Sequence, residues 1–170
     1  MKRTLMGLIV LVCFGHGVAA AEDECISAYR ENGLAIEVRD FKGILRSVEK
    51  MMRACEPTDR MRASYRAQRT LALTNLGRLK EGLAEADKCT QDYFADPGCY
   101  YWKAVIYKKL SNAKEFAKAK VAAVRICNAI IARAEETRKN AVGKIDTDNV
   151  NADIEVARIT LNNLNQLFFE

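Results

Sequence analysis

The sequence has little of what most enzymes and metalloproteins use. Of its 170 residues, one is histidine, His16, and two are proline. No two cysteines have the C-x-x-C spacing of a redox dithiol, and no cysteines and histidines are spaced as in zinc sites. Since the only histidine lies near the N-terminus, in a segment that we expect to be removed, the usual general base near neutral pH is missing. We therefore expect no enzyme activity, no catalytic residue, no metal site and no cofactor.

The chain also has no apolar run of the ~20 residues that a membrane span needs. Its first residues form another pattern, in which Lys2 and Arg3 give a basic head, an apolar stretch follows, and the small residues Ala19–Ala21 close it. This pattern is typical of a cleaved secretory signal. We expect 1–21 to be removed rather than kept as an anchor. Removing 21 of the 170 residues leaves 149, a single domain over 22–170 that is periplasmic or secreted.

The chain also lacks a large excess of positive or negative charge. Loss of Lys2 and Arg3 with the signal lowers the formal net charge from +5 to +3. Dedicated nucleic-acid-binding domains are usually strongly basic or carry a concentrated basic patch. We therefore expect no nucleic-acid partner and, after cleavage, no stable membrane anchor.

Helical periodicity dominates the rest of the chain. Apolar residues recur every three or four positions, as in Leu79, Leu83 and Ala86, and no stretch shows the sustained period-two alternation of strands. Pro57 and Pro97 each separate two such stretches. The pattern predicts an all-α chain. The expected helices span 24–38, 41–55, 59–77, 79–92, 99–110, 112–139 and 148–168.

Six of these helices pair as antiparallel hairpins with short connections. The seventh has an apolar stripe on one face and uncharged polar residues on the other, which is what a terminal capping helix needs. Shifting the chain by 34 positions places Cys55 on Cys89 and Gly43 on Gly77, so the hairpins are expected to repeat.

Two segments, LTNLGRLKEGLAEADKC and YYWKAVIYKKLSNAKEF, carry small and aromatic residues where two helices would pack closely. Through these segments the chain resembles the tetratricopeptide repeat (TPR) family over about 30–130. The resemblance implies a right-handed array of antiparallel helical hairpins. It also implies a concave groove, lined by the first helix of each hairpin, that binds another protein.

Five cysteines remain after signal cleavage, and in an exported chain they are expected to form disulfides. In a helical hairpin the first helix begins beside the end of the second. This favours a Cys25–Cys55 bridge in the first hairpin and a Cys99–Cys127 bridge in the third, with Cys89 unpaired. The alternative pairs Cys89 with Cys99 across the bend between the second and third hairpins and leaves Cys127 free.

One group of charged residues has a spacing that suggests a binding site. Arg62, Arg66 and Arg69 lie at i, i+4 and i+7 and therefore project from one face of a helix. Guanidinium groups bind carboxylates through paired hydrogen bonds, so we predict that an acidic segment or a carboxylate terminus of a partner protein docks there. The expected neighbours on the next hairpin are Tyr101, Trp102 and Lys103. The alternative is that the arginines pair with acidic residues of adjacent helices.

These features together predict an exported protein–protein interaction module, with the periplasm favoured over other exported locations. A more specific alternative is an immunity or inhibitor protein that neutralises a toxin or a cell-wall enzyme. A third possibility is a secreted helical carrier of apolar ligands, because small helical proteins with several disulfides can enclose a pocket.

Overall fold

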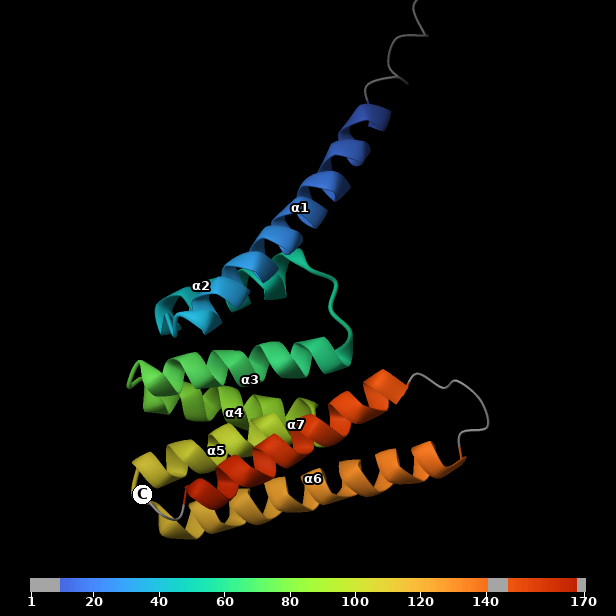
Figure 1. The fold of residues 1–170 in the computed structure, drawn as a ribbon. Helices are drawn as coiled ribbons and strands as arrows, with labels where there is room; N and C mark the ends of the chain where they lie inside the picture. The colour runs from blue at the N-terminus through green and yellow to red at the C-terminus, as the bar shows by residue number, and fades with distance from the viewer. Residues whose placement is uncertain (1–9, 141–146, 168–170) are drawn as a thin grey trace, which may run out of the picture.

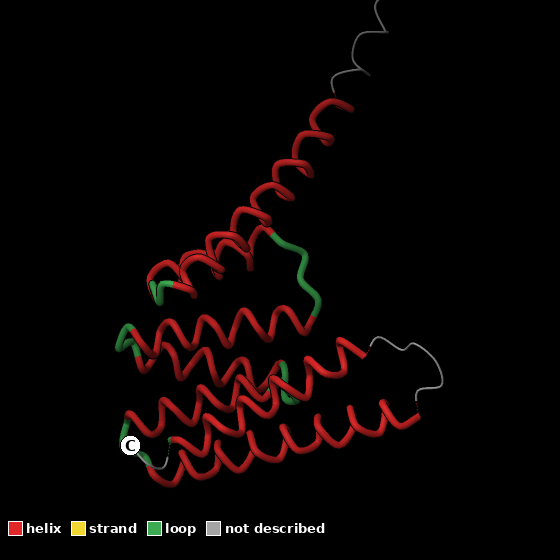
Figure 2. Tube along the Cα trace, viewed as in Figure 1, coloured by secondary structure: helices red, strands yellow, loops and turns green. Residues whose placement is uncertain are grey.

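The computed structural model describes residues 10–140 and 147–167, with side chains for 23–139 and 150–167. Throughout these ranges the chain is helical and contains no strand (Figure 2). The described helices are α1 Val10–Glu37, α2 Phe41–Ala54, α3 Asp59–Asn75, α4 Leu79–Asp92, α5 Pro97–Lys109, α6 Ala113–Asn140 and α7 Thr147–Gln166. The prediction of an all-α protein is confirmed.

The seven expected ranges are the seven helices seen in the described part of the chain. Six begin and end within a few residues of the prediction, whereas α1 begins at Val10 instead of near 24. Residues 1–9 of the predicted signal, and residue 168 at the expected end of the last helix, lie outside the described residues. The expected cleavage point after Ala21 falls within α1.

Short polar side chains fix where three of these helices begin. The Asp40 side chain accepts a hydrogen bond from the backbone N–H of Lys42 at the start of α2. The Thr58 side chain accepts one from the backbone N–H of Met61 at the start of α3. Asp96 accepts from the N–H of Cys99 at the start of α5, and Pro97 follows it in the first turn. Such caps satisfy backbone donors that have no partner inside the helix, so the local sequence specifies these helix starts.

The three helical hairpins turn by the same backbone arrangement. Arg39, Gly77 and Ser111, with φ values of 55°, 75° and 55°, are left-handed residues that end α1, α3 and α5. In each turn the next residue donates its N–H to the carbonyl five positions earlier: Asp40 to Ala35 at 2.8 Å, Arg78 to Leu73 at 2.9 Å and Asn112 to Tyr107 at 2.9 Å. This is the hydrogen bond of a Schellman C-cap.

The turn positions correct the repeat register that the sequence suggested. Gly77 and Ser111 are 34 residues apart, as expected for the second and third hairpins, but Arg39 and Gly77 are 38 apart. Gly43 is therefore not the equivalent of Gly77. It lies in the first turn of α2, where an added Cβ would come within 3.0 Å of the Cβ of Ala35 on α1. Gly43 thus permits close packing of two helices and forms no turn.

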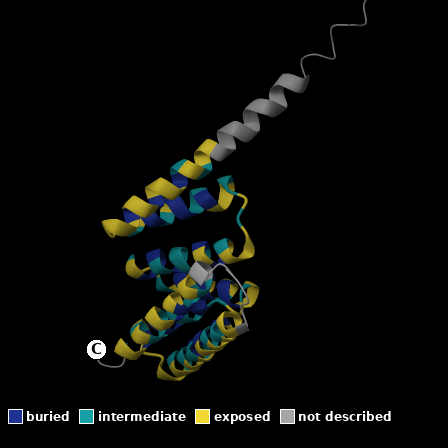
Figure 3. Ribbon diagram, turned by 45° about the vertical axis from the view of Figure 1, so that its right-hand side comes forward, coloured by how far each residue is buried: buried dark blue, intermediate teal, exposed yellow. Residues whose placement is uncertain are grey.

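Two hydrophobic clusters hold the array together, and Figure 3 shows buried residues on the helix faces that meet other helices. The first joins α1, α2 and α3; its buried members are Ala28, Ala35, Ile44, Val48, Met51, Tyr65 and Ala72. The second joins α5, α6 and α7; its buried members are Ala104, Ala119, Ala123 and Leu164. Alanines form most of the buried part of the second cluster, and larger side chains such as Tyr107 and Phe116 pack around them.

Helix α7 covers the last hairpin, as predicted for a capping helix. It runs alongside α6 and over α5 (Figure 1). Leu164 is fully buried between them, and the Lys108 ammonium of α5 donates to the Leu167 carbonyl at 2.6 Å. The described helices therefore have a TPR-like arrangement of three hairpins and a terminal helix. None of the helices searched in the described ranges is long and apolar enough to cross a membrane.

Candidate functional site

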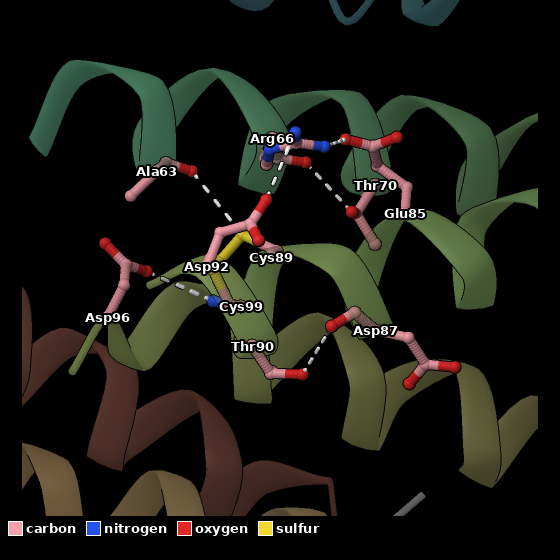
Figure 4. The surroundings of a disulfide bond; sticks show 10 residues. All are labelled: Ala63, Arg66, Thr70, Glu85, Asp87, Cys89, Thr90, Asp92, Asp96 and Cys99. Carbon is pink, nitrogen blue, oxygen red and sulfur yellow. Dashed lines mark hydrogen bonds and ion pairs between the residues drawn. A yellow bond between two sulfur atoms is a disulfide. The ribbon is translucent and has the colours of Figure 1, made fainter. Parts of the chain in front are cut away.

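Two disulfides connect neighbouring helical segments among the described residues. Cys25 and Cys55 join α1 to the end of α2, with an S–S distance of 2.13 Å, and this is the first pair that the sequence favoured. Cys89 and Cys99 join α4 to α5, with an S–S distance of 1.99 Å (Figure 4). The expected Cys99–Cys127 bridge is wrong, because Cys99 bonds to the alternative partner.

The short connection between α4 and α5 explains this pairing. Helix α4 ends at Asp92 and α5 begins at Pro97, so the chain folds back at once and the Cα atoms of Cys89 and Cys99 lie 5.5 Å apart. Cys127 lies within α6 as a free, fully buried thiol. Burial, together with the nearby Asp96 carboxylate, raises the pKa of that thiol to about 11. Cys127 is therefore a packed core residue with little thiolate character.

The expected arginine site is largely neutralised within the molecule. The Glu85 carboxylate of α4, whose side chain is 5% exposed, accepts from both Arg66 and Arg69, at 2.8 and 2.6 Å. Arg66 also pairs with Asp92 of α4, and Arg69 with Glu49 of α2, each at 3.3 Å. Figure 4 shows Arg66 between Glu85 and Asp92. We call Arg66, Arg69, Glu85, Asp92 and Glu49 the arginine cluster.

Arg66 and Arg69 face α2 and α4 and bind acidic residues of these neighbouring helices, which is the alternative interpretation of the sequence. Burial alone would lower the pKa of Arg66, but the hydrogen bond and the charge of Glu85 outweigh it, and the net shift is upward. The guanidinium group therefore stays charged and paired.

The other predicted binding residues make no ion pair with the arginine cluster, although Arg62 lines a small pocket beside Arg66. Arg62 is exposed and its Nε donates to the Pro57 carbonyl at 3.1 Å. Lys103 forms an ion pair with Asp87 of α4 at 2.7 Å. Tyr101 and Trp102 pack edge to face, with ring centroids 4.9 Å apart. Of the six residues named from the sequence, Arg66 and Arg69 share Glu85 and Tyr101 packs on Trp102, whereas Arg62 and Lys103 have other partners.

A different feature lies on the side of the array where α3, α5 and α7 begin and α4 ends (Figure 1). Side chains from these elements enclose a cleft of about 540 Å³, which we call the end cleft. Its lining residues are Asp59, Arg60 and Ala63 of α3, Asp92, Tyr93, Phe94, Ala95, Asp96 and Pro97 from α4 to α5, Ile130 and Arg133 of α6, and Asp153, Val156 and Ala157 of α7.

Local chemistry fixes one wall of the end cleft. The loop from Tyr93 to Asp96 is bracketed by the Cys89–Cys99 disulfide. The Asp96 carboxylate accepts from the N–H of Cys99 at 3.1 Å (Figure 4), which ties the loop to the first turn of α5. The opposite side is joined by the ion pair of Arg60 on α3 with Asp153 on α7, at 2.5 Å. The disulfide and the Asp96 cap therefore hold one wall of the cleft, whereas the exposed Arg60–Asp153 pair contributes little.

The sequence signals for this cleft were weak. Its residues run from 59 to 157, and no spacing pattern connects them. One visible signal was the loop DYFADPGC, where the large aromatic Phe94 stands between two cysteines and is 74% exposed in the structure. An aromatic residue in a clamped loop is a candidate for contact with a partner. Across the described residues, no group of three or more His, Cys, Asp or Glu side chains is arranged to hold a metal ion.

Comparison with known proteins gives distant structural likenesses. The chain is similar to a structure titled "TPR2B-domain:pHsp70-complex of yeast Sti1", with 16% sequence identity and a TM-score of 0.46, over 79% of this chain and 96% of that one. No family model and no curated protein matches the sequence. At this level of similarity the likeness assigns the chain to no family.

Proposed function

We propose that the protein is an exported protein–protein interaction module that works in the periplasm and binds a partner protein at the end cleft. The observation that carries the proposal is the cleft itself: about 540 Å³, on a helical-hairpin scaffold, with the exposed aromatic Phe94 at its wall. Arrays of helical hairpins present extended surfaces to partners. Concave sites with apolar walls and a few polar groups are where binding usually occurs.

The cysteines and the N-terminal sequence support export. Disulfides persist in oxidising compartments such as the periplasm, and the structure contains two of them. The basic head, apolar stretch and Ala19–Ala21 of the N-terminus have the pattern of a cleaved signal. Mass spectrometry of the protein from a periplasmic fraction should find a chain that begins at Glu22 and carries both disulfides. A chain that keeps residues 1–21 contradicts the cleavage proposal.

The arginine cluster is the less favoured binding surface. A partner's carboxylate that bound Arg66 or Arg69 would have to displace Glu85, which both guanidinium groups already contact. That exchange replaces one ion pair by another and therefore adds little binding free energy. The end cleft needs no such displacement at Phe94, and for this reason we place the partner there.

Site-specific photo-crosslinking tests the location of the partner. A photoreactive phenylalanine analogue replaces Phe94, which is 74% exposed, or Val38, which is 72% exposed and lies after the end of α1. After irradiation of cells that export each variant, we expect one discrete adduct from position 94 and none from position 38. No adduct at 94, or the same adducts at both positions, contradicts the proposal.

A further inference from the structure

The chemistry of the end cleft suggests which kind of partner segment it accepts. Its floor is apolar, since Ala63 and Ala157 are 3% and 0% exposed and Pro97 is buried. At its edge, Phe94 and Val156 leave 74% and 53% of their surface exposed. An apolar floor beside an exposed aromatic ring can cover the aliphatic stem of a long side chain.

The charges around this floor are unbalanced. Four carboxylates line the cleft, those of Asp59, Asp92, Asp96 and Asp153, against two guanidinium groups, those of Arg60 and Arg133. Arg60 is paired with Asp153, and Asp92 pairs with Arg66 outside the lining. The cleft therefore has an excess of negative charge, the reverse of the arginine face that the sequence suggested.

Two of the four carboxylates take no part in the ion pairs of the cleft. Neither Asp59 nor Asp96 forms an ion pair with another described residue. The Asp96 carboxylate accepts backbone N–H groups of Gly98 and Cys99, and its burial nevertheless raises its pKa. A cation bound near Asp96 would offset that cost of burial, because an opposite charge stabilises the ionised form. Among the charged residues that line the same cleft, the Arg60 guanidinium of α3 acts on Asp96 and favours its ionised form, and the Cys127 thiol of α6 also lies near Asp96. The other charged lining residues are Asp59, Asp92, Arg133 and Asp153.

We propose that the end cleft binds a basic segment of a partner protein. A lysine or arginine of that segment lays its aliphatic stem along Phe94 and Val156 and places its cationic group near Asp59 and Asp96. Phe94 adds a cation–π contact with the same group. The inference rests on the proposed function, because it names the chemistry of the partner at that surface.

Matched peptides test the proposal on the full mature chain with both disulfides intact. One synthetic peptide carries lysines among leucines and serines, and its counterpart has glutamate at each lysine. In NMR titrations of the labelled protein we expect the lysine peptide to shift the backbone signals of residues 93–97 and to bind at least about tenfold more tightly than its counterpart. The affinity should fall as salt rises.

Charge-only variants locate the contact. Asp59→Asn and Asp96→Asn should each weaken the lysine peptide by about threefold, and Asn at 96 still caps α5. The control is Glu155→Gln, which removes one negative charge from an exposed position of α7 outside the lining. We expect Glu155→Gln to leave the affinity unchanged. Equal losses in all three variants would mean non-specific attraction and would overturn the site.

The outcomes separate this inference from the proposed function. Equal or tighter binding of the glutamate peptide, or no binding of either peptide, overturns the basic-segment proposal. If position 94 still yields its crosslinked adduct, the protein-binding function stands with a different partner chemistry. Spermidine that competes as tightly as the lysine peptide assigns the cleft to free polyamines and also overturns the proposal.

Discussion

Helix α3 carries charges in its middle that are paired with other helices and a charge at its start that is not. In its middle, Arg66 and Arg69 share the buried Glu85 carboxylate, and these ion pairs connect α3 to α4. At its start, Asp59 lies on the end cleft and forms no ion pair with a described residue. The difference teaches that the regular spacing of like charges says less about binding than the partners that the fold supplies to each charge.

Removal of Glu85 is the strongest test of this contrast. Glu85→Gln leaves two partly buried guanidinium groups without their shared carboxylate, and we expect a loss of about 3 kcal/mol of unfolding free energy. This is the low end of the usual range, because Asp92 and Glu49 still contact the arginines. Urea denaturation measures it.

The matched control for this variant is Glu81→Gln. Glu81 pairs with Arg78 at the surface of the same helix, with its side chain 58% exposed, and such exposed pairs contribute little to stability. Equal effects of the two substitutions would show that the arginine cluster is a surface feature and would remove the contrast.

The Cys89–Cys99 disulfide should matter both for stability and for the cleft. Its loop spans a separation of 10 residues, and the chain-entropy estimate for such a loop is about 2.7 kcal/mol. In Cys89→Ser/Cys99→Ser we also expect faster amide hydrogen exchange at Tyr93–Ala95 and weaker binding of the lysine peptide, because the wall of the end cleft loses its clamp.

The first disulfide provides the control for that effect. Cys25→Ser/Cys55→Ser opens a loop with a separation of 30 residues. We expect it to lower the unfolding free energy by about 3.6 kcal/mol, which is more than the loss expected for the other bridge. Exchange at the end cleft should nevertheless stay as in the wild type, since this bridge lies on α1 and α2. Equal acceleration at Tyr93–Ala95 in both double variants would mean that the clamp has no local role.

Cys127 should resist modification in the folded protein. It is fully buried, and with a pKa of about 11 only about one thiol in a thousand is ionised at pH 8. We expect no alkylation of the native mature chain and one equivalent after denaturation without reductant, located at Cys127 by peptide mass spectrometry. Labelling of Cys89 or Cys99 in that experiment would contradict the second disulfide.

Asp96 should give the smallest effect, visible as a dependence of stability on pH. Burial raises its pKa, so the folded state holds the proton more tightly than the unfolded state. Its contribution to the unfolding free energy therefore falls as the pH rises from the unfolded pKa, about 3.9, through the folded pKa, and is constant above it.

The comparison variant is Asp96→Asn, which cannot ionise and still caps α5. Subtracting its unfolding free energy from that of the wild type at pH 4, 5, 6 and 7 should give a difference that decreases with pH and then levels off. A difference that does not change, or that increases with pH, would show that burial does not hold the Asp96 proton.

Much of the fold was predictable because its determinants are local. Helix caps such as Thr58 and Asp96 act within a few positions, and so does the helical spacing of apolar residues. The predicted helix ranges therefore agree with the observed ones within a few residues, except at the start of α1. The register of the first repeat was wrong because Gly43 and Gly77 look alike in sequence. Gly43 lies at a contact between two helices, whereas Gly77 adopts the left-handed conformation of a turn.

The candidate site was predictable only in part. The spacing of Arg66 and Arg69 correctly placed them on one side of a helix, yet the acidic residues that face them come from α2 and α4. The end cleft was missed because its carboxylates lie on different elements, from Asp59 on α3 to Asp153 on α7. Pairings across such distances in sequence leave no periodic signal.

The sequence by itself determined an all-helical chain of hairpins with short connections and a capping helix. Caps, turns and amphipathic faces each depend on residues within a few positions of one another. Only the tertiary structure decided that Cys99 bonds to Cys89, that Glu85 neutralises the arginines, and that carboxylates from separate helices meet at the end cleft. These features depend on distances between helices, and those distances are set when the hydrophobic faces pack.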